Sequence, residues 1–277
     1  MARVRETTSG APLRPGQVAL LTLALAFVAV MLLLPLALVL ATAFREGVGA
    51  WWRAVSDAYA VKALGLTVLA TAVAVAVNTA LGLCMAWLVT RFSFRGKKAL
   101  TSLIDLPMAI SPVIVGLSFL LVFGRKSPLA PLLGLLPFDI LFAVPGIVLA
   151  TVFVTFPFVA RSVISVLEAR GTDEEEAAAL MGAGGLTIFR RVTLPHIRWA
   201  LIYGVVLCTA RAMGEFGAVS VVSGHLRGLT NTLPLHIEIL FNEFQYVPAF
   251  AASTVLVALA VVVLVAKSVL TRRMEEE

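Results

Sequence analysis

Five long stretches of this chain carry no charged residue, and they constrain the fold more than any other feature. They cover residues 18–44, 63–90, 106–124, 140–160 and 250–266. A lipid bilayer offers backbone groups no hydrogen-bond partner, so a segment that crosses it as a helix needs about 20 apolar residues. A sixth stretch, 199–223, meets this condition only if Arg211 and Glu215 are tolerated within it. We therefore predict an all-α membrane protein with six transmembrane helices.

The composition of the chain supports this class. Hydrophobic residues make up 60% of the 277 residues and charged residues 14%, whereas soluble domains are about 45–50% apolar and about 25% charged. The net charge of +6 could indicate a nucleic-acid partner, but the basic residues flank the apolar runs instead of forming one patch. We therefore expect contact with membrane lipid and no nucleic-acid partner. The run 18–44 exceeds the apolar core of a cleaved signal peptide, about 7–15 residues, and is predicted to be a retained helix.

The lysine and arginine residues predict the orientation, because they are enriched in cytoplasmic loops. With six spans both termini face one side, and that side carries fifteen of the 22 basic residues: Arg3, Arg5, Arg14, Arg91, Arg95, Lys97, Lys98, Arg161, Arg170, Arg190, Arg191, Arg198, Lys267, Arg272 and Arg273. The opposite side carries Arg45, Arg53, Lys62, Arg125, Lys126 and Arg227. We expect cytoplasmic tails at 1–16 and 271–277. Between them we expect one transmembrane domain, 17–270, with a cytoplasmic loop at 170–197 and an extracytoplasmic loop at 224–247.

The cytoplasmic segment 170–197, "RGTDEEEAAALMGAGGLTIFRRVTLPHI", predicts two short helices joined by a glycine turn. Thr172 and Glu175 have the spacing of a capping box, and the acidic run 173–176 places negative charge at the positive end of the helix dipole. Glycines after residue 181 end the first helix, and Pro195 opens the next span. The loop is expected to expose Leu180, Met181, Ile188 and Phe189. Such exposed apolar side chains indicate a docked partner; the alternative is a solvated acidic helix.

These residues resemble a known signature. Glu176-Ala177-Ala178, three residues, Gly182, nine residues and then Val192-Thr193-Leu194-Pro195 are similar to the EAA motif of ATP-binding-cassette (ABC) importer permeases, with valine in place of the more common isoleucine. The resemblance implies the type I ABC importer permease fold. It also implies that this loop is the coupling helix that inserts into an ATPase subunit. The residues that match the motif are Glu176, Ala177, Ala178, Gly182, Leu194 and Pro195.

A second resemblance concerns the transported ion. The stretch "ARAMGEFGAVSVVSGHLRGLTNTLPLHIEILFNEF" resembles the CysW-type sulfate/thiosulfate permease family, and "DLPMAISPVIVGL" fits the wider sulfate, molybdate and tungstate group. The resemblance implies a multi-pass permease of the bacterial inner membrane that forms half of the path of a sulfate/thiosulfate importer. The implied partners are a second related permease, two ABC ATPase subunits and an extracytoplasmic sulfate-binding protein. The alternative is a molybdate or tungstate permease that works as a homodimer.

The sequence lacks the motifs of catalysis. There is no GxxxxGK[ST] phosphate loop, and neither HExxH nor GxSxG occurs. His196, His225 and His236 do not have the spacing of metal ligands. We therefore expect no enzyme, no metal site and no cofactor bound by this chain, with ATP and Mg²⁺ used by the partner ATPase. An intramembrane enzyme would need a nucleophile or metal set, and a free-standing secondary carrier would have no use for an EAA loop.

Arg211 and Glu215 are the candidate residues of the translocation path or gate. A single charge at the middle of a bilayer costs about 2.5–3.5 kcal/mol, but four residues are about one helical turn, so the two side chains can pair. In one reading they pair with each other or with the partner permease and fix the packing near the gate. In the other, Arg211 transiently contacts the anion while Glu215 limits how tightly it is held. Beyond them, Leu235, Ile239 and Phe244 have the spacing of a helix on the membrane surface, either a docking site for the binding protein or a cap on the bundle.

Overall fold

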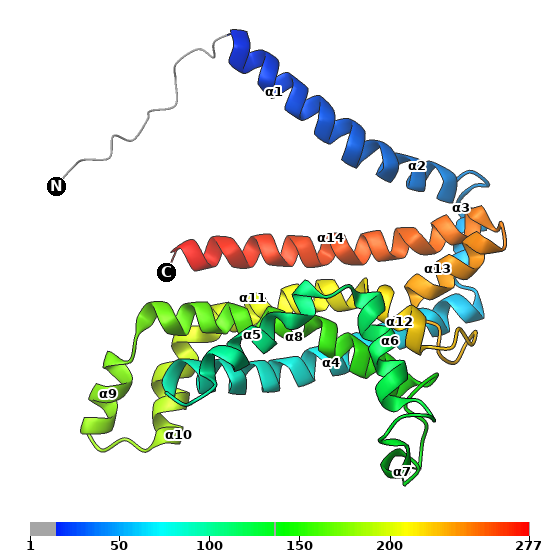
Figure 1. Cartoon of the computed structure of the whole chain (residues 1–277). Helices are drawn as coiled ribbons and strands as arrows, with labels where there is room; N and C mark the ends of the chain where they lie inside the picture. The colour runs from blue at the N-terminus through cyan, green and yellow to red at the C-terminus, as the bar shows by residue number, and fades with distance from the viewer. Residues whose placement is uncertain (1–14, 136, 277) are drawn as a thin grey trace.

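The computed structural model describes residues 15–135 and 137–276, and in these residues all regular structure is helical (Figure 1). The first fourteen residues of the predicted N-terminal tail, with Arg3, Arg5 and Arg14, lie outside the described residues. The elements are α1 (Pro15–Val28), η1 (Ala29–Leu33), α2 (Leu34–Ala43), α3 (Val48–Val55), α4 (Ala58–Arg91), α5 (Lys97–Ala109), α6 (Pro112–Phe123), α7 (Ala130–Leu133), α8 (Val144–Arg170), α9 (Asp173–Leu180), α10 (Gly185–Ile188), η2 (Phe189–Thr193), α11 (Leu194–Met213), α12 (Gly217–Val222), α13 (Leu233–Asn242) and α14 (Tyr246–Glu276).

Five helical segments of the described chain are long and apolar enough to cross a membrane: Pro15–Ala43, Ala58–Arg91, Val144–Arg170, Gly185–Met213 and Tyr246–Thr271. The pair α5 and α6 passes the same test only together, and it is bent by 111°. The count is therefore five, or six when the bent pair is one span. Helix α8 continues to Arg170, so Arg161, which follows the apolar run 140–160, still lies inside the helix. Helix α14 continues through Glu276, so the backbone of 271–276 extends the last helix.

The predicted third span, 106–124, is broken at its centre. Ile110 and Ser111 have extended backbone angles, with ψ of 140° and 133°. Pro112 follows directly, and the proline ring disfavours the helical region for the residue before it. The chain therefore turns sharply here, and α6 starts with the proline in its first turn, where the missing N–H costs nothing.

Two π-helical turns, η1 and η2, lie directly before prolines. Leu34 donates to the carbonyl of Ala29 and Leu194 donates to that of Phe189, five residues back in each case. The next residue is Pro35 or Pro195, which has no N–H to offer and crowds the preceding turn. The wider turn lets the helix continue past the proline. In η2 this joins the short helix α10 to α11 in one continuous segment, Gly185–Met213.

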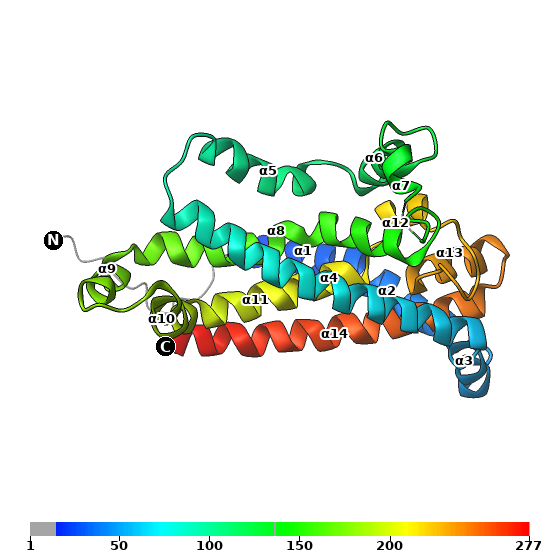
Figure 2. The ribbon, with the colours of Figure 1, turned by 90° about the horizontal axis from the view of Figure 1, so that it is seen from below.

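The centre of the molecule is the packing of α4, α8 and α11 through small residues (Figure 2). A β-carbon on Gly82 would lie 3.1 Å from the backbone nitrogen of Ala160, and one on Gly204 would lie 3.0 Å from the Cα of Val159. Small residues allow this approach, which replaces hydrophobic driving force as the source of helix association in lipid. Asn78 adds a polar contact from α4, because its amide donates to the Val152 carbonyl and the Thr155 hydroxyl of α8.

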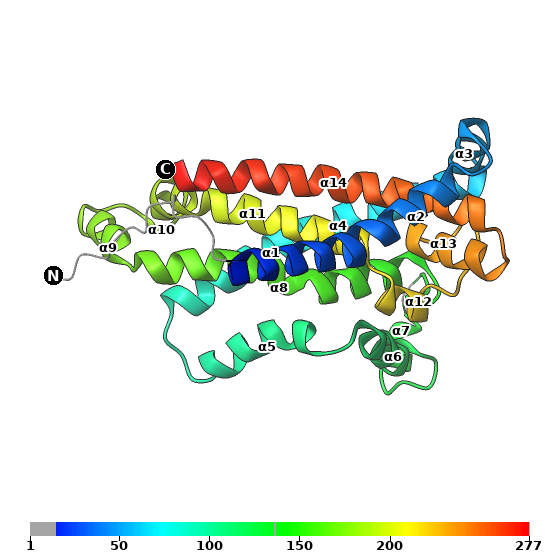
Figure 3. The same ribbon diagram turned by 90° about the horizontal axis from the view of Figure 1, so that it is seen from above.

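The other helices take different positions around this centre. Helices α5 and α6 stand together on one side of the bundle, with α12 between α6 and α8 (Figures 2 and 3). The first span packs on α14 through α2, whereas the apolar window of Pro15–Ala43 has no buried residue. Its exposed leucines fit contact with lipid. Helices α9 and α10 lie at one end of the bundle and α3 and α13 at the other (Figure 1).

Candidate functional site

The predicted coupling loop projects from the end of the bundle as α9, a glycine turn and α10 (Figure 1). Helix α9 begins at Asp173, as the sequence predicts, and carries four acidic residues in its first turn. The predicted capping box is wrong. The Thr172 side chain accepts no backbone hydrogen bond and donates instead to Glu176 Oε1, at 2.6 Å. Glu175, its expected partner, turns toward the bundle because a stronger partner lies there.

Glu175 joins three elements that are far apart in the sequence. Arg91, at the end of α4, donates to both of its carboxylate oxygens, at 2.8 and 3.1 Å, and also to the Leu167 carbonyl of α8. The Thr193 hydroxyl of η2 donates to the same carboxylate, at 2.8 Å. The Arg91 side chain is only 9% exposed, so the pair is screened little by solvent. This contact fixes the base of the loop on the ends of α4 and α8.

Gly182 ends α9 with a left-handed backbone, φ +88°. The N–H of Ala183 bonds to the carbonyl of Ala178, and that of Gly182 to the carbonyl of Ala179. This is the bonding pattern of a Schellman motif, in which glycine is favoured because it has no β-carbon to clash. Open space surrounds the position of a β-carbon on Gly182, so backbone conformation rather than crowding requires glycine within this chain.

The loop presents a small apolar surface, and its composition differs in part from the prediction. Leu180 is 90% exposed, Met181 is 82% exposed, and Leu186 is exposed beside them. Ile188 and Phe189 were also expected here but are half-buried, because the Phe189 ring packs edge-on against Trp87, with centroids 6.2 Å apart. Leu180, Met181 and Leu186 therefore form the apolar tip of the loop.

The remaining motif residues have distinct places. Glu176 and Ala177 are exposed on α9, while Ala178 is buried against the base of the loop. Leu194 is half-buried and packs against the core cluster around Ile197, and Pro195 is exposed in the first turn of α11. The structure thus brings Glu176, Ala177 and Gly182 to one projecting unit and places Leu194 and Pro195 where that unit joins the membrane span.

Sequence reasoning missed Arg91, Glu175 and Thr193. Arg91 counted only as a topology signal, and Glu175 only as a capping residue. One weak signal exists, since Arg91 directly ends an apolar run. Nothing in the run of four acidic residues distinguishes Glu175 from its neighbours, because the distinction depends on which of them faces α4.

Arg211 and Glu215 pair, as predicted, but not in the middle of a helix. Helix α11 ends at Met213, and the chain passes through Gly214 and Glu215 before α12 begins. Arg211 Nη1 lies 2.6 Å from Glu215 Oε2; the orientation is that of an ion pair and not of a directed hydrogen bond. The other oxygen, Oε1, accepts the N–H of Ala218 at 2.8 Å. The charge pair therefore occupies a break in the fifth span, where free backbone groups need polar partners.

The two members of this pair are unequal. The Glu215 side chain is 1% exposed, whereas that of Arg211 is 34% exposed. The carboxylate is fixed twice, by the guanidinium and by the start of α12. The Arg211 side chain is the partly exposed member of the pair. The break is closely packed on one side, because Gly217 lies against Pro112 of α6.

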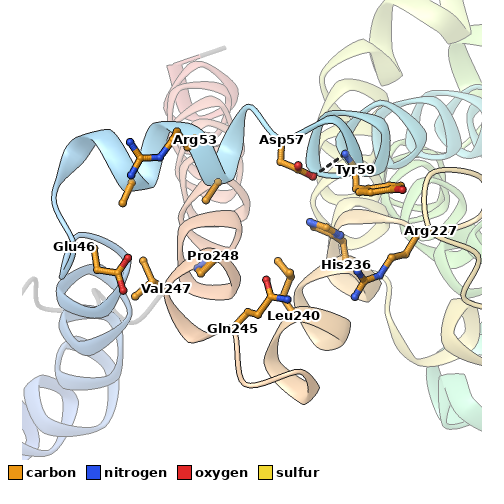
Figure 4. A pocket seen from close by; sticks show the side chains of 12 residues that line it. Glu46, Arg53, Asp57, Tyr59, Arg227, His236, Leu240, Gln245, Val247 and Pro248 are labelled. Atoms are coloured by element: carbon orange, nitrogen blue, oxygen red, sulfur yellow. Dashed lines mark hydrogen bonds between the residues drawn. The ribbon is translucent and has the colours of Figure 1, made fainter.

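A charged cavity of about 390 Å³ lies at the end of the molecule opposite the coupling loop, between α3, α13 and the start of α14 (Figure 4). Arg53, Asp57, Arg227 and His236 line it. Burial lowers the pKa of His236. Among its charged neighbours, Arg227 also lowers this pKa, whereas Asp57 and Glu243 raise it. The predicted surface helix is α13; Leu235 is buried, Ile239 is half-buried, and Phe244 follows the helix and is exposed.

The other histidines pair singly with carboxylates, His196 with Glu174 at 3.2 Å and His225 with Glu238 at 3.5 Å. Within the residues that the structure describes, no three His, Cys, Asp or Glu side chains come together as metal ligands would.

Comparison with known proteins agrees with this arrangement. Residues 78–276 match the family described as "Binding-protein-dependent transport system inner membrane component". The chain is 45% identical over 266 residues to the sulfate transport system permease protein CysW of Escherichia coli K12, covering 96% of this chain and 91% of that protein. It is 36% identical over 259 residues to the permease protein CysT of Salmonella typhimurium LT2, covering 94% of each.

A solved structure shows the same fold. A chain of a bacterial alginate ABC transporter, crystallised with an alginate pentasaccharide-bound periplasmic protein, superposes with a TM-score of 0.78 at 17% identity, covering 93% of this chain and 94% of that one. The helices, the broken spans and the sequence matches agree: this chain belongs to the binding-protein-dependent ABC importer permeases of the inner membrane, in their CysW-type family.

Proposed function

We propose that this chain is one permease subunit of an ATP-driven sulfate importer, which also accepts thiosulfate. It forms half of the translocation path. The observation that carries the proposal is the coupling loop, because its apolar tip is exposed while its base is fixed by Glu175 to Arg91 and Thr193. A loop with a rigid base and an exposed apolar tip is suited to docking into another protein and to transmitting its movement. The similarity to CysW supplies the substrate class.

The partners proposed are a second, related permease, two ABC ATPase subunits that use ATP and Mg²⁺, and an extracytoplasmic sulfate-binding protein. The lower identity to CysT than to CysW favours a heterodimer of two distinct permeases over the homodimer expected of a molybdate or tungstate permease. We place both termini and the loop 170–197 in the cytoplasm, from the distribution of basic residues. The loop 224–247 would then face the binding protein.

Within the path, Arg211 is the proposed contact for the anion. A hydrated dianion needs a polar lining but no tight site, since a strong site would trap it. Glu215 stays fixed by Ala218 and lowers the net attraction of Arg211. Movement of the ATPase subunits would reach this pair through α11, which begins at the coupling loop and carries Arg211 in its last turn.

The test is transport by the whole complex. This chain is purified with a second CysT-like permease, the ATPase and the binding protein, and reconstituted in phospholipid vesicles. Uptake of radiolabelled sulfate should require ATP and the binding protein, and unlabelled thiosulfate should compete. ATP-driven molybdate uptake by a complex that contains this permease alone, with no uptake of sulfate, would overturn the proposal in favour of the homodimer.

A further inference from the structure

A second arginine–carboxylate pair lies on the same side of the bundle as the broken spans. Arg161 of α8 makes an ion pair with Asp105 of α5, and its guanidinium also donates to the Thr101 carbonyl, at 3.3 Å. Helix α5 stands on the side of the bundle where α6 and α12 also lie (Figures 2 and 3). The Arg211–Glu215 pair lies at the α11–α12 junction, next to α6, on this same side.

The packing of α8 on α11 fixes the relative depth of the two arginines. Gly204 of α11 lies against Val159 and Ser162 of α8, so Arg161 is level with Gly204. Arg211 is seven residues further along α11, which is about 10 Å at 1.5 Å per residue. Counted from Val144, the first residue of α8, Arg161 lies about 26 Å along the helix, near its coupling-loop end. The two pairs are therefore at successive positions along the bundle axis.

Exposure separates Arg161 and Arg211 from Arg91, although not from Arg227, which pairs with Glu243 at the opposite end of the bundle and is also 35% exposed. The side chains of Arg161 and Arg211 are 35% and 34% exposed, while that of Arg91, at the coupling-loop end, is 9% exposed. Arg91 is enclosed by its partners and acts as a structural anchor. The side chains of Arg161 and Arg211 are each partly exposed, and a guanidinium donates the charge-assisted, forked hydrogen bonds that oxyanions accept.

We propose that Arg161 is a second anion-contacting residue of the translocation path, paired with Asp105 as Arg211 is paired with Glu215. This inference rests on the proposed function. A tetrahedral dianion that leaves Arg211 meets Arg161 about 10 Å further toward the coupling loop. At each position a carboxylate competes for the arginine, so the anion is held weakly and released. Two weak sites in sequence allow entry and exit, whereas one strong site would stop transport.

The experiment uses the reconstituted four-component complex. Sulfate uptake and ATP hydrolysis are measured as functions of the external concentration of sulfate-bound binding protein. Arg161→Gln should lower the maximal uptake rate about ten-fold or more, the effect of one charge-assisted contact, while the complex still assembles. Arg161→Lys should retain part of the rate, because the charge remains. Arg95→Gln, an exposed arginine in the α4–α5 turn, is the matched control and should transport as the wild type does.

Asp105→Asn and the double variant distinguish this role from a merely structural pair. Without its carboxylate competitor, Arg161 should hold sulfate more tightly, so Asp105→Asn should lower both the apparent KM and the maximal rate. Arg161→Gln with Asp105→Asn should be as slow as Arg161→Gln alone. If the pair only holds α5 on α8, Asp105→Asn should resemble Arg161→Gln with an unchanged KM, and the neutral double variant should recover. Either result overturns the inference.

The failure of the inference is separable from that of the proposed function. Sulfate uptake by the wild-type complex tests the function alone. If the wild type imports sulfate and Arg161→Gln does so equally well, Arg161 is not in the path and the proposed function stands. Should Arg161→Gln fail to assemble, the KM of Asp105→Asn still decides, because a lower KM supports the contact and an unchanged one contradicts it.

Discussion

Among single residues, the Arg211–Glu215 pair shows how charge is accommodated in an apolar transmembrane segment. The Glu215 carboxylate is buried, accepts the N–H of Ala218 and pairs with Arg211, whose side chain is partly exposed. Pairing offsets much of the cost of placing either charge in lipid. The residue that the structure leaves available is therefore the arginine.

Arg211→Gln should lower sulfate uptake strongly while membrane insertion and complex assembly persist. The change removes the anion contact, but it also leaves Glu215 buried without its counter-charge, which can cost about 3–5 kcal/mol. Arg211→Gln with Glu215→Gln removes that burden and is the control for folding. Uptake by the reconstituted complex is the measurement, with assembly followed by size-exclusion chromatography. Wild-type uptake in the double variant would exclude Arg211 from the path.

His236 should make the stability of the fold depend on pH. Burial among α3, α13 and α14 lowers its pKa below the ordinary value of 6.5. The unfolded chain therefore takes up this proton more readily than the folded one. The stability that neutral His236 contributes is complete above pH 6.5 and is lost as the pH falls toward the lowered pKa. Thermal unfolding in detergent, measured between about pH 7.5 and 5, should show that His236→Gln loses less stability than the wild type as the pH falls. An equal loss of stability in the two proteins would contradict the assignment.

At the scale of elements, the coupling loop combines a rigid base with an exposed tip. Its two short helices could not be stable alone, since isolated helices of fewer than about 12 residues are marginal in water. The Glu175 contacts and the Schellman turn at Gly182 supply the order. Local sequence therefore sets where the helices start and stop, and tertiary contacts hold them in place.

Gly182 is the residue of this element whose substitution is most informative. Gly182→Ala should cost about 1–2 kcal/mol, because alanine is strained at positive φ, and should reduce coupling modestly. Gly182→Arg adds bulk to the docking surface and should uncouple ATP hydrolysis from uptake. Gly184 has an ordinary φ of −72°, so Gly184→Ala is the backbone control and should have a small effect. The ratio of sulfate imported to ATP hydrolysed is the measurement, and an unchanged ratio in Gly182→Arg would count against the docking assignment.

At the scale of the whole molecule, the bundle depends on close approach at a few small residues. Gly204→Leu would place a side chain where the Val159 backbone and Ser162 already lie. Overpacking of this kind costs about 1–3 kcal/mol, and it would also shift Arg211 relative to α8. Gly65→Leu, at a position with open space around it, is the matched control. The midpoint of thermal unfolding, monitored by circular dichroism, should fall only for Gly204→Leu. Equal midpoints for the two variants would show that the α8–α11 contact does not limit stability.

The helical membrane class, the positions of the long spans, the EAA-like motif and the Arg211–Glu215 pair could all be predicted from the amino-acid sequence. All of these depend on information within about 20 residues, because the bilayer thickness fixes the length of an apolar run and the helical repeat brings residues four apart together. The prolines and glycines that break the third and fifth spans were visible, but the same residues occur in unbroken membrane helices, as Pro157 does inside α8.

The contacts between residues that are far apart in the sequence depend on how the helices pack together. This packing separated Glu175 from three adjacent acids by facing it to Arg91, it paired Arg161 of α8 with Asp105 of α5, and it placed Glu215 in a break instead of a helix. The physical reason is that these outcomes depend on how helices rotate and how deeply they pack, which small residues such as Gly82 and Gly204 set by allowing backbones to touch. No local pattern carries that geometry.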